Sequence, residues 1–210
     1  MKIDFVSDVA CPWCAVGLNS LERALERIGD AIPVELHFEP FELNPTLDAA
    51  GADAADYLRA KYGLSPEQLA QNRANIRDRG AAVGFAFGER AHVWNTFDAH
   101  RLLHWAGLEG RQLPLKRGLL EAYHRDGENV SDHEVLVRIA REAGLDEAGA
   151  RAVLATDAHA AAVRERERFY QAQGINGVPA VIVDDRYLIS GGQPPEVYEQ
   201  SLRRIHEGAD

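Results

Sequence analysis

Two cysteines, Cys11 and Cys14, are the residues whose type and spacing point most directly to chemistry. They are the only cysteines of the chain, and Pro12 and Trp13 separate them in the stretch CPWC. Thiols three positions apart occur in dithiol redox sites and as one half of a zinc site, and two inert buried thiols are a third interpretation. The spacing alone does not choose between redox and metal chemistry.

The zinc interpretation needs two further ligands besides the two cysteines. His100 and His104, in the stretch HRLLH, lie one helical turn apart and are the formal candidates. They lie far along the chain from the cysteines, whereas a compact zinc site uses short spacings. We therefore favour the redox pair and expect no bound metal.

The elements around the cysteines predict different chemical roles for the two thiols. Residues Lys2–Ser7 have the pattern of a strand, and Pro12 suits the first position of a helix that ends at Gly29. The free N–H groups and the dipole of a helix start favour a thiolate there. We expect Cys11 to be the exposed nucleophile and Cys14, one turn further on, to be the buried resolving thiol.

The remaining pattern predicts an α/β thioredoxin-like fold with a large all-helical insertion. Residues 34–39 form a second strand after the first helix, which makes a β-α-β unit with parallel strands. Residues 178–183 and 186–190 form a hairpin around Asp184-Asp185, followed by a helix over 196–207. These two halves share one sheet. We assign residues 1–45 and 160–210 to the thioredoxin-like domain and 46–159 to the inserted helical domain.

The long segment between the two halves has a helical pattern over most of residues 52–174. We expect about six helices there, two of which begin at the capping-box sequences Ser65–Gln68 and Ser131–Glu134. Residues 84–95 are predicted to be a loop rich in aromatic side chains.

Composition narrows the classes of partner. The chain has 210 residues, 46% of them hydrophobic, and a formal net charge of −10 without a block of Lys or Arg. Nucleic acid and anionic membranes are therefore not expected as partners. The sequence contains no signal-peptide pattern and no apolar stretch of membrane-spanning length, so we expect a cytoplasmic protein.

Several stretches together resemble the DsbA family of thiol-disulfide oxidoreductases. They are DFVSDVACPWC and GVPAVIVDDRYLISGGQP, and the stretches FELNP, AHRLLHWA and SDHEVL resemble its cytoplasmic FrnE-like branch. The resemblance covers essentially the whole chain. It implies an insertion that lies over the active site and a cis proline, Pro179, that faces the cysteine pair. The backbone of Val178 would then be free to pair with an extended substrate.

The resemblance also assigns roles to three other side chains. Asp4 matches an acidic residue that sits behind the second cysteine and relays its proton; the alternative is a solvated carboxylate at a strand end. Trp13 stands where the strongly oxidising periplasmic members have histidine, so we do not expect strong oxidising power. We expect Trp13 to be a flat substrate contact, with Trp94 and Phe87 lining the same groove unless they belong to the core.

These observations predict a dithiol-disulfide oxidoreductase that exchanges, reduces or isomerises disulfides of proteins and peptides. It needs no bound cofactor besides the redox-active Cys11–Cys14 disulfide, and a thiol such as glutathione serves as reductant. One alternative is a glutathione-dependent isomerase or transferase of the kappa or hydroxychromene carboxylate isomerase type. Another is a non-enzymatic redox sensor. The second thiol favours the oxidoreductase, because an isomerase has no use for a resolving cysteine.

Overall fold

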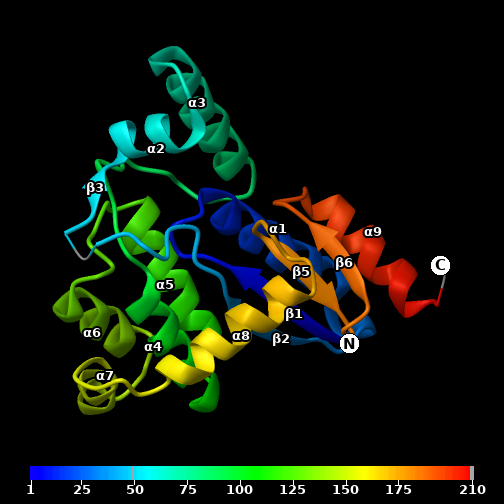
Figure 1. The fold of residues 1–210 in the computed structure, drawn as a ribbon. Coiled ribbons are helices and arrows are strands. Elements are labelled where there is room, and N and C mark those ends of the chain that lie inside the picture. The colour runs from blue at the N-terminus through cyan, green and yellow to red at the C-terminus, as the bar shows by residue number, and fades with distance from the viewer. Residues whose placement is uncertain (49, 209–210) are drawn as a thin grey trace.

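A four-stranded mixed sheet forms the centre of the part that carries the cysteines (Figure 1). The structure, a computed structural model, describes residues 1–48 and 50–208. The strand order is β2-β1-β5-β6. Strand β1 (Lys2–Ser7) pairs in parallel with β2 (Glu35–Pro40) and antiparallel with β5 (Ala180–Val183), which in turn pairs with β6 (Tyr187–Ser190). This is the predicted thioredoxin-like sheet.

Local sequence explains where these elements begin and end. Helix α1 (Pro12–Ile28) starts at its proline and stops at Gly29, whose φ of 56° few other residues adopt. The β5–β6 turn has Asp184 and Asp185 at φ values of 49° and 56°, the pair of positive angles that a two-residue hairpin requires. Helix α9 (Pro195–His206) then packs along α1.

Seven α-helices connect β2 to β5 within the described residues, one more than predicted. They are α2 (Ala54–Tyr62), α3 (Pro66–Ala82), α4 (Phe97–Leu108), α5 (Gln112–His124), α6 (His133–Glu142), α7 (Glu147–Leu154) and α8 (Ala160–Ala172). The segment predicted to be an aromatic loop contains β4 (His92–Val93), which pairs with β3 (Ala52–Asp53). This two-residue pairing is too short to leave a pattern in the sequence.

The two predicted capping boxes have different outcomes. The Ser65 side chain accepts a hydrogen bond from the Gln68 amide, and the Gln68 side chain accepts one from the Ser65 amide, as predicted. At the start of α6 the cap is Asp132 instead of Ser131. The Asp132 carboxylate accepts from the amides of Glu134 and Val135, and a carboxylate at this position also interacts favourably with the helix dipole.

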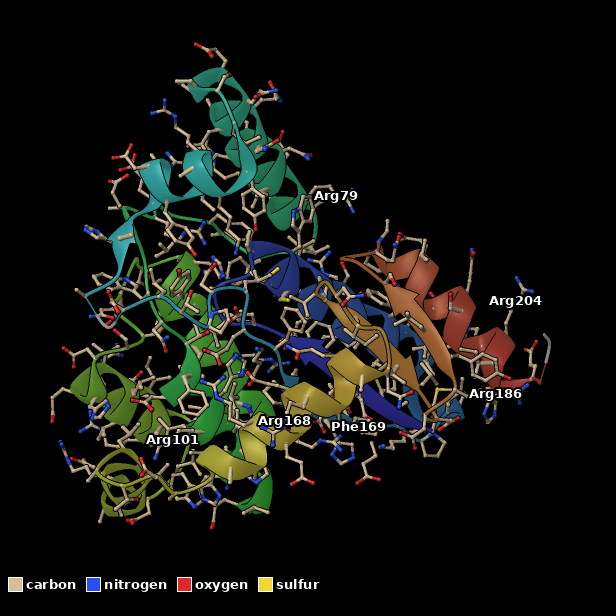
Figure 2. The ribbon with its side chains drawn as sticks, viewed as in Figure 1. Arg79, Arg101, Arg168, Phe169, Arg186 and Arg204 are labelled. Carbon is tan, nitrogen blue, oxygen red and sulfur yellow. The ribbon has the colours of Figure 1, made fainter. Side chains whose placement is uncertain are left out.

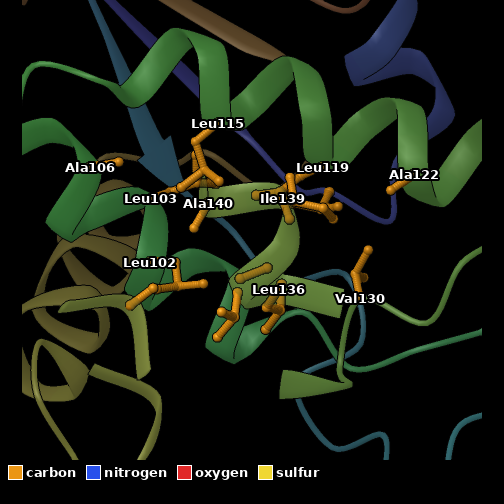
Figure 3. Close-up of a cluster of buried hydrophobic side chains, with 14 of the residues drawn as sticks. Leu102, Leu103, Ala106, Leu115, Leu119, Ala122, Val130, Leu136, Ile139 and Ala140 are labelled. Atoms are coloured by element: carbon orange, nitrogen blue, oxygen red, sulfur yellow. The ribbon is translucent and has the colours of Figure 1, made fainter. Parts of the chain in front are cut away.

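The hydrophobic side chains form separate clusters on the sheet and among the helices. Helices α1 and α9 pack together, and their cluster includes Phe5 of β1, whereas α8 covers the other side of the sheet through Tyr170 and Val6 (Figure 1). Helices α4, α5, α6 and α7 enclose the largest cluster, which contains Leu102, Leu119 and Leu136 (Figure 3). The domain boundaries at residues 45/46 and 159/160 stay a prediction. Among the described residues, no helix is long and apolar enough to cross a membrane.

Candidate active site

The two cysteines lie at the start of α1, and both are free thiols. Cys11 is the N-cap residue, and the Cys14 amide donates to its carbonyl oxygen over 3.0 Å. The Cys11 side chain is 4% exposed and Cys14 is fully buried. The burial of Cys14 agrees with the prediction, but the expectation of an exposed Cys11 is wrong, because neighbouring elements cover its sulfur.

The environment of Cys14 favours its neutral form. Burial raises the pKa of the Cys14 thiol well above its usual value, and a hydrogen bond with the Cys11 side chain raises it further. The two thiols lie one helical turn apart at the start of α1. A thiol that is neutral until its partner reacts suits the resolving position of a dithiol pair.

The segment before β5 lies against Cys11. The Val178–Pro179 peptide bond is cis, and the Cys11 thiol donates to the Val178 carbonyl oxygen over 3.5 Å. No first-turn amide donates to the Cys11 sulfur, contrary to the expectation for a thiolate. Pro179 packs on α1, since a Cβ on Gly17 would come within 3.0 Å of its ring. A glycine at position 17 therefore allows the proline to approach the helix closely.

Val178 also offers a backbone group to a substrate. Its N–H makes no backbone hydrogen bond within the described residues. Its side chain is half-buried beside both clusters of the sheet. An extended peptide could therefore pair with this amide next to the Cys11 sulfur.

A cavity of about 630 Å³ opens above Cys11, between the CPWC stretch and helices α2 and α3. Its walls are mostly apolar, with Leu58, Leu69, Ile76 and Phe87 among the lining side chains. The polar residues of the wall include three arginines, Arg73, Arg77 and Arg90. This volume is in the range of small-molecule and peptide side-chain sites. Helices α2 and α3 form one wall of this cavity, and the segments around Leu43, Phe87 and Val178 form the others.

Helix α3 is tied to the cysteine motif through Arg79. Its guanidinium lies 5.8 Å from the centre of the Trp13 ring and donates to the Gly192 carbonyl oxygen over 3.2 Å. Figure 2 shows Arg79 at the end of α3 nearest α1. Gly192 lies so near the motif that a Cβ would come within 2.9 Å of the Trp13 carbonyl oxygen. Trp13, which is half-buried, thus lines the cavity and contacts helix α3, which covers one side of it.

The carboxylate of Asp8 organises the loop between β1 and α1. It accepts hydrogen bonds from the amides of Ala10 and Leu43 and from the Thr96 hydroxyl, and it contacts His100 Nε2 at 3.4 Å. Burial acts to raise the pKa of the Asp8 carboxyl, but the interactions with His100 and the two amides outweigh it and lower the pKa. Asp8 therefore joins three segments that surround Cys11.

His124 and Arg90 support the same loop from the helical side. His124 Nε2 donates to the Val9 carbonyl oxygen over 2.8 Å, and Arg90 donates to the Ala10 carbonyl oxygen over 3.1 Å. Burial, and then the charge of Arg90, lower the pKa of His124 to about 3. The imidazole is therefore neutral at physiological pH and acts here as a hydrogen-bond donor, not as a titrating group.

The structure does not place Asp4 behind Cys14, so the expected proton relay through Asp4 is wrong. The Asp4 carboxylate is buried, accepts from the Tyr170 hydroxyl over 3.1 Å, and pairs with Lys2 at 2.9 Å. Tyr170 belongs to α8, which covers the side of the sheet opposite to α1. The neighbouring residue in β1, Phe5, is the one that packs with Cys14.

Trp94 is also not where it was expected. It is not among the residues that line the cavity, because it packs against the helical cluster and stacks on His92 at a centroid distance of 5.0 Å. Phe87 does line the cavity. For the zinc interpretation, His100 is engaged with Asp8, and no group of three His, Cys, Asp or Glu side chains suited to a metal occurs within residues 1–48 and 50–208.

Sequence reasoning missed Asp8, Arg90, His124 and the α2–α3 cover of the cavity. For Asp8 a signal existed, since a carboxylate directly after an apolar strand and three residues before Cys11 is costly to bury without partners. For the other features there was none, because their contacts join segments that are distant along the chain.

Comparison with known proteins identifies the family. The model of the DSBA-like thioredoxin domain matches residues 2–203. The chain belongs to this family. It is similar to the crystal structure of a probable DsbA oxidoreductase from Streptomyces coelicolor, with 38% identity, a TM-score of 0.93, and coverage of 99% of this chain and 90% of that one. The match does not distinguish the FrnE-like branch, which stays a prediction.

Two more distant structures share the fold of this family member. The cytosolic disulfide reductase DsbM from Pseudomonas aeruginosa, solved with GSH, is 18% identical with a TM-score of 0.68, and 99% of this chain and 100% of that one are covered. A 2-hydroxychromene-2-carboxylate isomerase is 15% identical with a TM-score of 0.75, covering 99% of this chain and 97% of the other. At such identities the likeness concerns the fold alone.

Proposed function

We propose that this protein is a dithiol-disulfide oxidoreductase that exchanges, reduces or isomerises disulfides of peptides and proteins. The observation that carries the proposal is the pair of free thiols at the start of α1, with Cys11 at the cavity and Cys14 fully buried. The membership in a family of DsbA-like proteins supports it.

The proposed reaction proceeds in two exchange steps. The Cys11 thiolate attacks a substrate disulfide, so a Cys11–substrate S–S bond forms and the other substrate sulfur leaves as a thiolate that takes up a proton. Cys14, as a thiolate, then attacks the Cys11 sulfur and releases the second substrate thiol. The two electrons that reduce the substrate come from the dithiol, which ends as the Cys11–Cys14 disulfide. Two molecules of a small thiol such as glutathione regenerate the dithiol and leave as their own disulfide.

Substrate binding in this proposal uses the surfaces beside Cys11. The free N–H of Val178 pairs with an extended peptide segment, and the Trp13 ring supplies a flat apolar contact. The apolar cavity beneath α2 and α3 takes a side chain next to the reacting cysteine. A cytoplasmic setting with a thiol reductant belongs to the same proposal, and the cytosolic reductase from Pseudomonas aeruginosa is a precedent with this fold.

The proposal is tested by the reduction of insulin with dithiothreitol. The wild-type protein should accelerate insulin precipitation. Cys14→Ser should lose turnover and retain a stable mixed disulfide on Cys11, detectable by mass spectrometry, whereas Cys11→Ser should show neither turnover nor trapping. Trapping on Cys14 instead of Cys11 would reverse the assigned roles, and no acceleration by wild type would reject the oxidoreductase.

A second candidate function is a glutathione-dependent isomerase or transferase. The mostly apolar cavity beside Cys11, and the fold shared with the isomerase, favour it. This function predicts turnover of a small electrophile with glutathione that survives Cys14→Ser. The oxidoreductase predicts that Cys14→Ser abolishes turnover, so one variant separates the two functions.

A further inference from the structure

Lys116 is a buried lysine for which the sequence suggested no purpose. It lies on α5, is 1% exposed, and makes no hydrogen bond or ion pair within 4 Å among the described residues. Burying an ammonium group without a direct partner is costly. A lysine in such a place therefore requires charges or polar groups at somewhat longer range.

Its position on α5 brings it close to the cysteine pair. Leu120, one helical turn after Lys116 and on the same side of the helix, packs in the cluster that contains Cys14 and Phe38. Phe38 and Lys116 also line one small cavity. Lys116 therefore adjoins the packed layer that covers Cys14.

The small cavity offers the lysine contact with water. Its volume is about 90 Å³, which is enough to hold ordered water. Besides Lys116 it is lined by His100, His104, Gln112, Glu39 and Arg166, among others. Water in this cavity can accept hydrogen bonds from the ammonium group, and so keep it charged despite its burial.

The titratable groups around Lys116 come from several elements. They are Asp8 after β1, Cys11 at the N-cap of α1 and Cys14 in its first turn, His100 and His104 of α4, His124 of α5, Glu39 of β2 and Arg166 of α8. Burial lowers the pKa of Lys116, while the charges of Cys14, Asp8 and Cys11 oppose that shift. His100 is engaged with Asp8, and His124 is neutral at physiological pH. The charge of Lys116 acts to lower the pKa of the buried Cys14 thiol, against the effect of burial.

We propose that the Lys116 ammonium stabilises the Cys14 thiolate in the resolving step. This inference rests on the proposed oxidoreductase function and takes the place of the relay expected from Asp4. During the step, Cys14 loses its proton, attacks the Cys11 sulfur of the mixed disulfide, and the released substrate sulfur takes up a proton. Lys116 keeps its charge throughout. It acts through Cys14 and does not touch the substrate.

The test compares the pH dependence of resolution in variants of Lys116. Reduced protein is mixed with a short peptide disulfide, quenched with acid at increasing times, and the Cys11 mixed disulfide is quantified by mass spectrometry. Lys116→Met, which keeps size and removes charge, should slow resolution about tenfold near neutral pH and raise its pH midpoint by about one unit. Lys116→Arg should restore most of the rate. The Met variant and wild type should converge at alkaline pH, where Lys116 is neutral.

Leu119→Ala is the matched control, since it perturbs buried packing on the same helix without changing charge. It should leave the pH midpoint unchanged. An unchanged rate and midpoint in Lys116→Met, or an equal shift in Leu119→Ala, would overturn the role of Lys116 while the oxidoreductase stands. If wild type forms neither the mixed disulfide nor the Cys11–Cys14 disulfide, the proposed function itself is rejected, and the role of Lys116 with it.

Discussion

Asp8 is the residue that best illustrates how one side chain organises this site. Its four hydrogen-bond contacts join the loop before Cys11 to the segment after β2 and to the start of α4. Each of these partners donates, or can donate, a hydrogen bond to the Asp8 side chain, so the site stabilises an ionised carboxylate. The neutral amide of asparagine would place donors against donors there.

Asp8→Asn should lower the free energy of unfolding by about 2–4 kcal/mol at neutral pH. The pKa of Asp8 is lower in the folded protein than its ordinary value of 3.8, so the carboxylate adds stability above that value and loses it as the pH falls through the folded-state pKa. The acid side of the stability curve should therefore be flatter in the variant. Urea unfolding at several pH values measures both effects.

Asp30→Asn is a suitable control for this measurement because the side chain is exposed. It should change the free energy of unfolding by less than about 0.5 kcal/mol. An equal loss in both variants, or no loss in Asp8→Asn, would contradict the role assigned to Asp8.

At the scale of the elements, the α2–α3 pair covers one side of the cavity above Cys11. The contact of Arg79 with Trp13 and Gly192 fastens α3 over the cavity. Loss of one hydrogen bond and one cation–π contact costs about 1–1.5 kcal/mol. That amount makes opening of the cover roughly five to ten times more frequent.

Arg79→Ala should therefore increase the rate at which iodoacetamide alkylates Cys11 by about five- to tenfold. The comparison is made in the Cys14→Ser background, where only one thiol reacts. Arg59→Ala, which removes the same charge from an exposed position of α2 that does not line the cavity, should leave the rate nearly unchanged. Equal rates for the two arginine variants would mean that Arg79 does not hold the cover.

Elements with local signals were predictable, and those that depend on distant contacts were not. Pro12 and Gly29 bound α1, and Asp184 and Asp185 determine the β5–β6 turn, because each acts through its own backbone angles. The β3–β4 pairing and the cavity depend on segments that meet only in the folded chain. The sequences of these segments contain no pattern that indicates which other segment each one contacts.

The site residues also divide into those with a local sequence signal and those placed by contacts between distant segments. Cys11 and Cys14 were evident from spacing, whereas the side of the sheet that Asp4 faces depends on which helix covers which face. A strand alternates its side chains between two faces, so the sequence placed Asp4 on one face without saying whether α1 or α8 lies there. Lys116 comes to the site only through the packing of α5 against α1.

At the scale of the whole molecule, two structural parts meet at the cysteines. The sheet and α1 present the thiols, while the helical insertion supplies the cavity cover, the partners of Asp8 and the charge of Lys116. The pair should therefore behave as one dithiol unit whose potential is set by both parts. With Trp13 in the motif, we expect a moderate potential near that of the cytosolic glutathione pool, about −220 to −320 mV.

Equilibration of the protein with glutathione buffers tests this central claim most directly. Acid quenching, alkylation and mass spectrometry give the fractions of dithiol, Cys11–Cys14 disulfide and glutathione adduct at each ratio. We expect one two-electron transition from dithiol to intramolecular disulfide, with little adduct. A stable glutathione adduct on Cys11 with Cys14 still reduced, or no disulfide at any ratio, would contradict it.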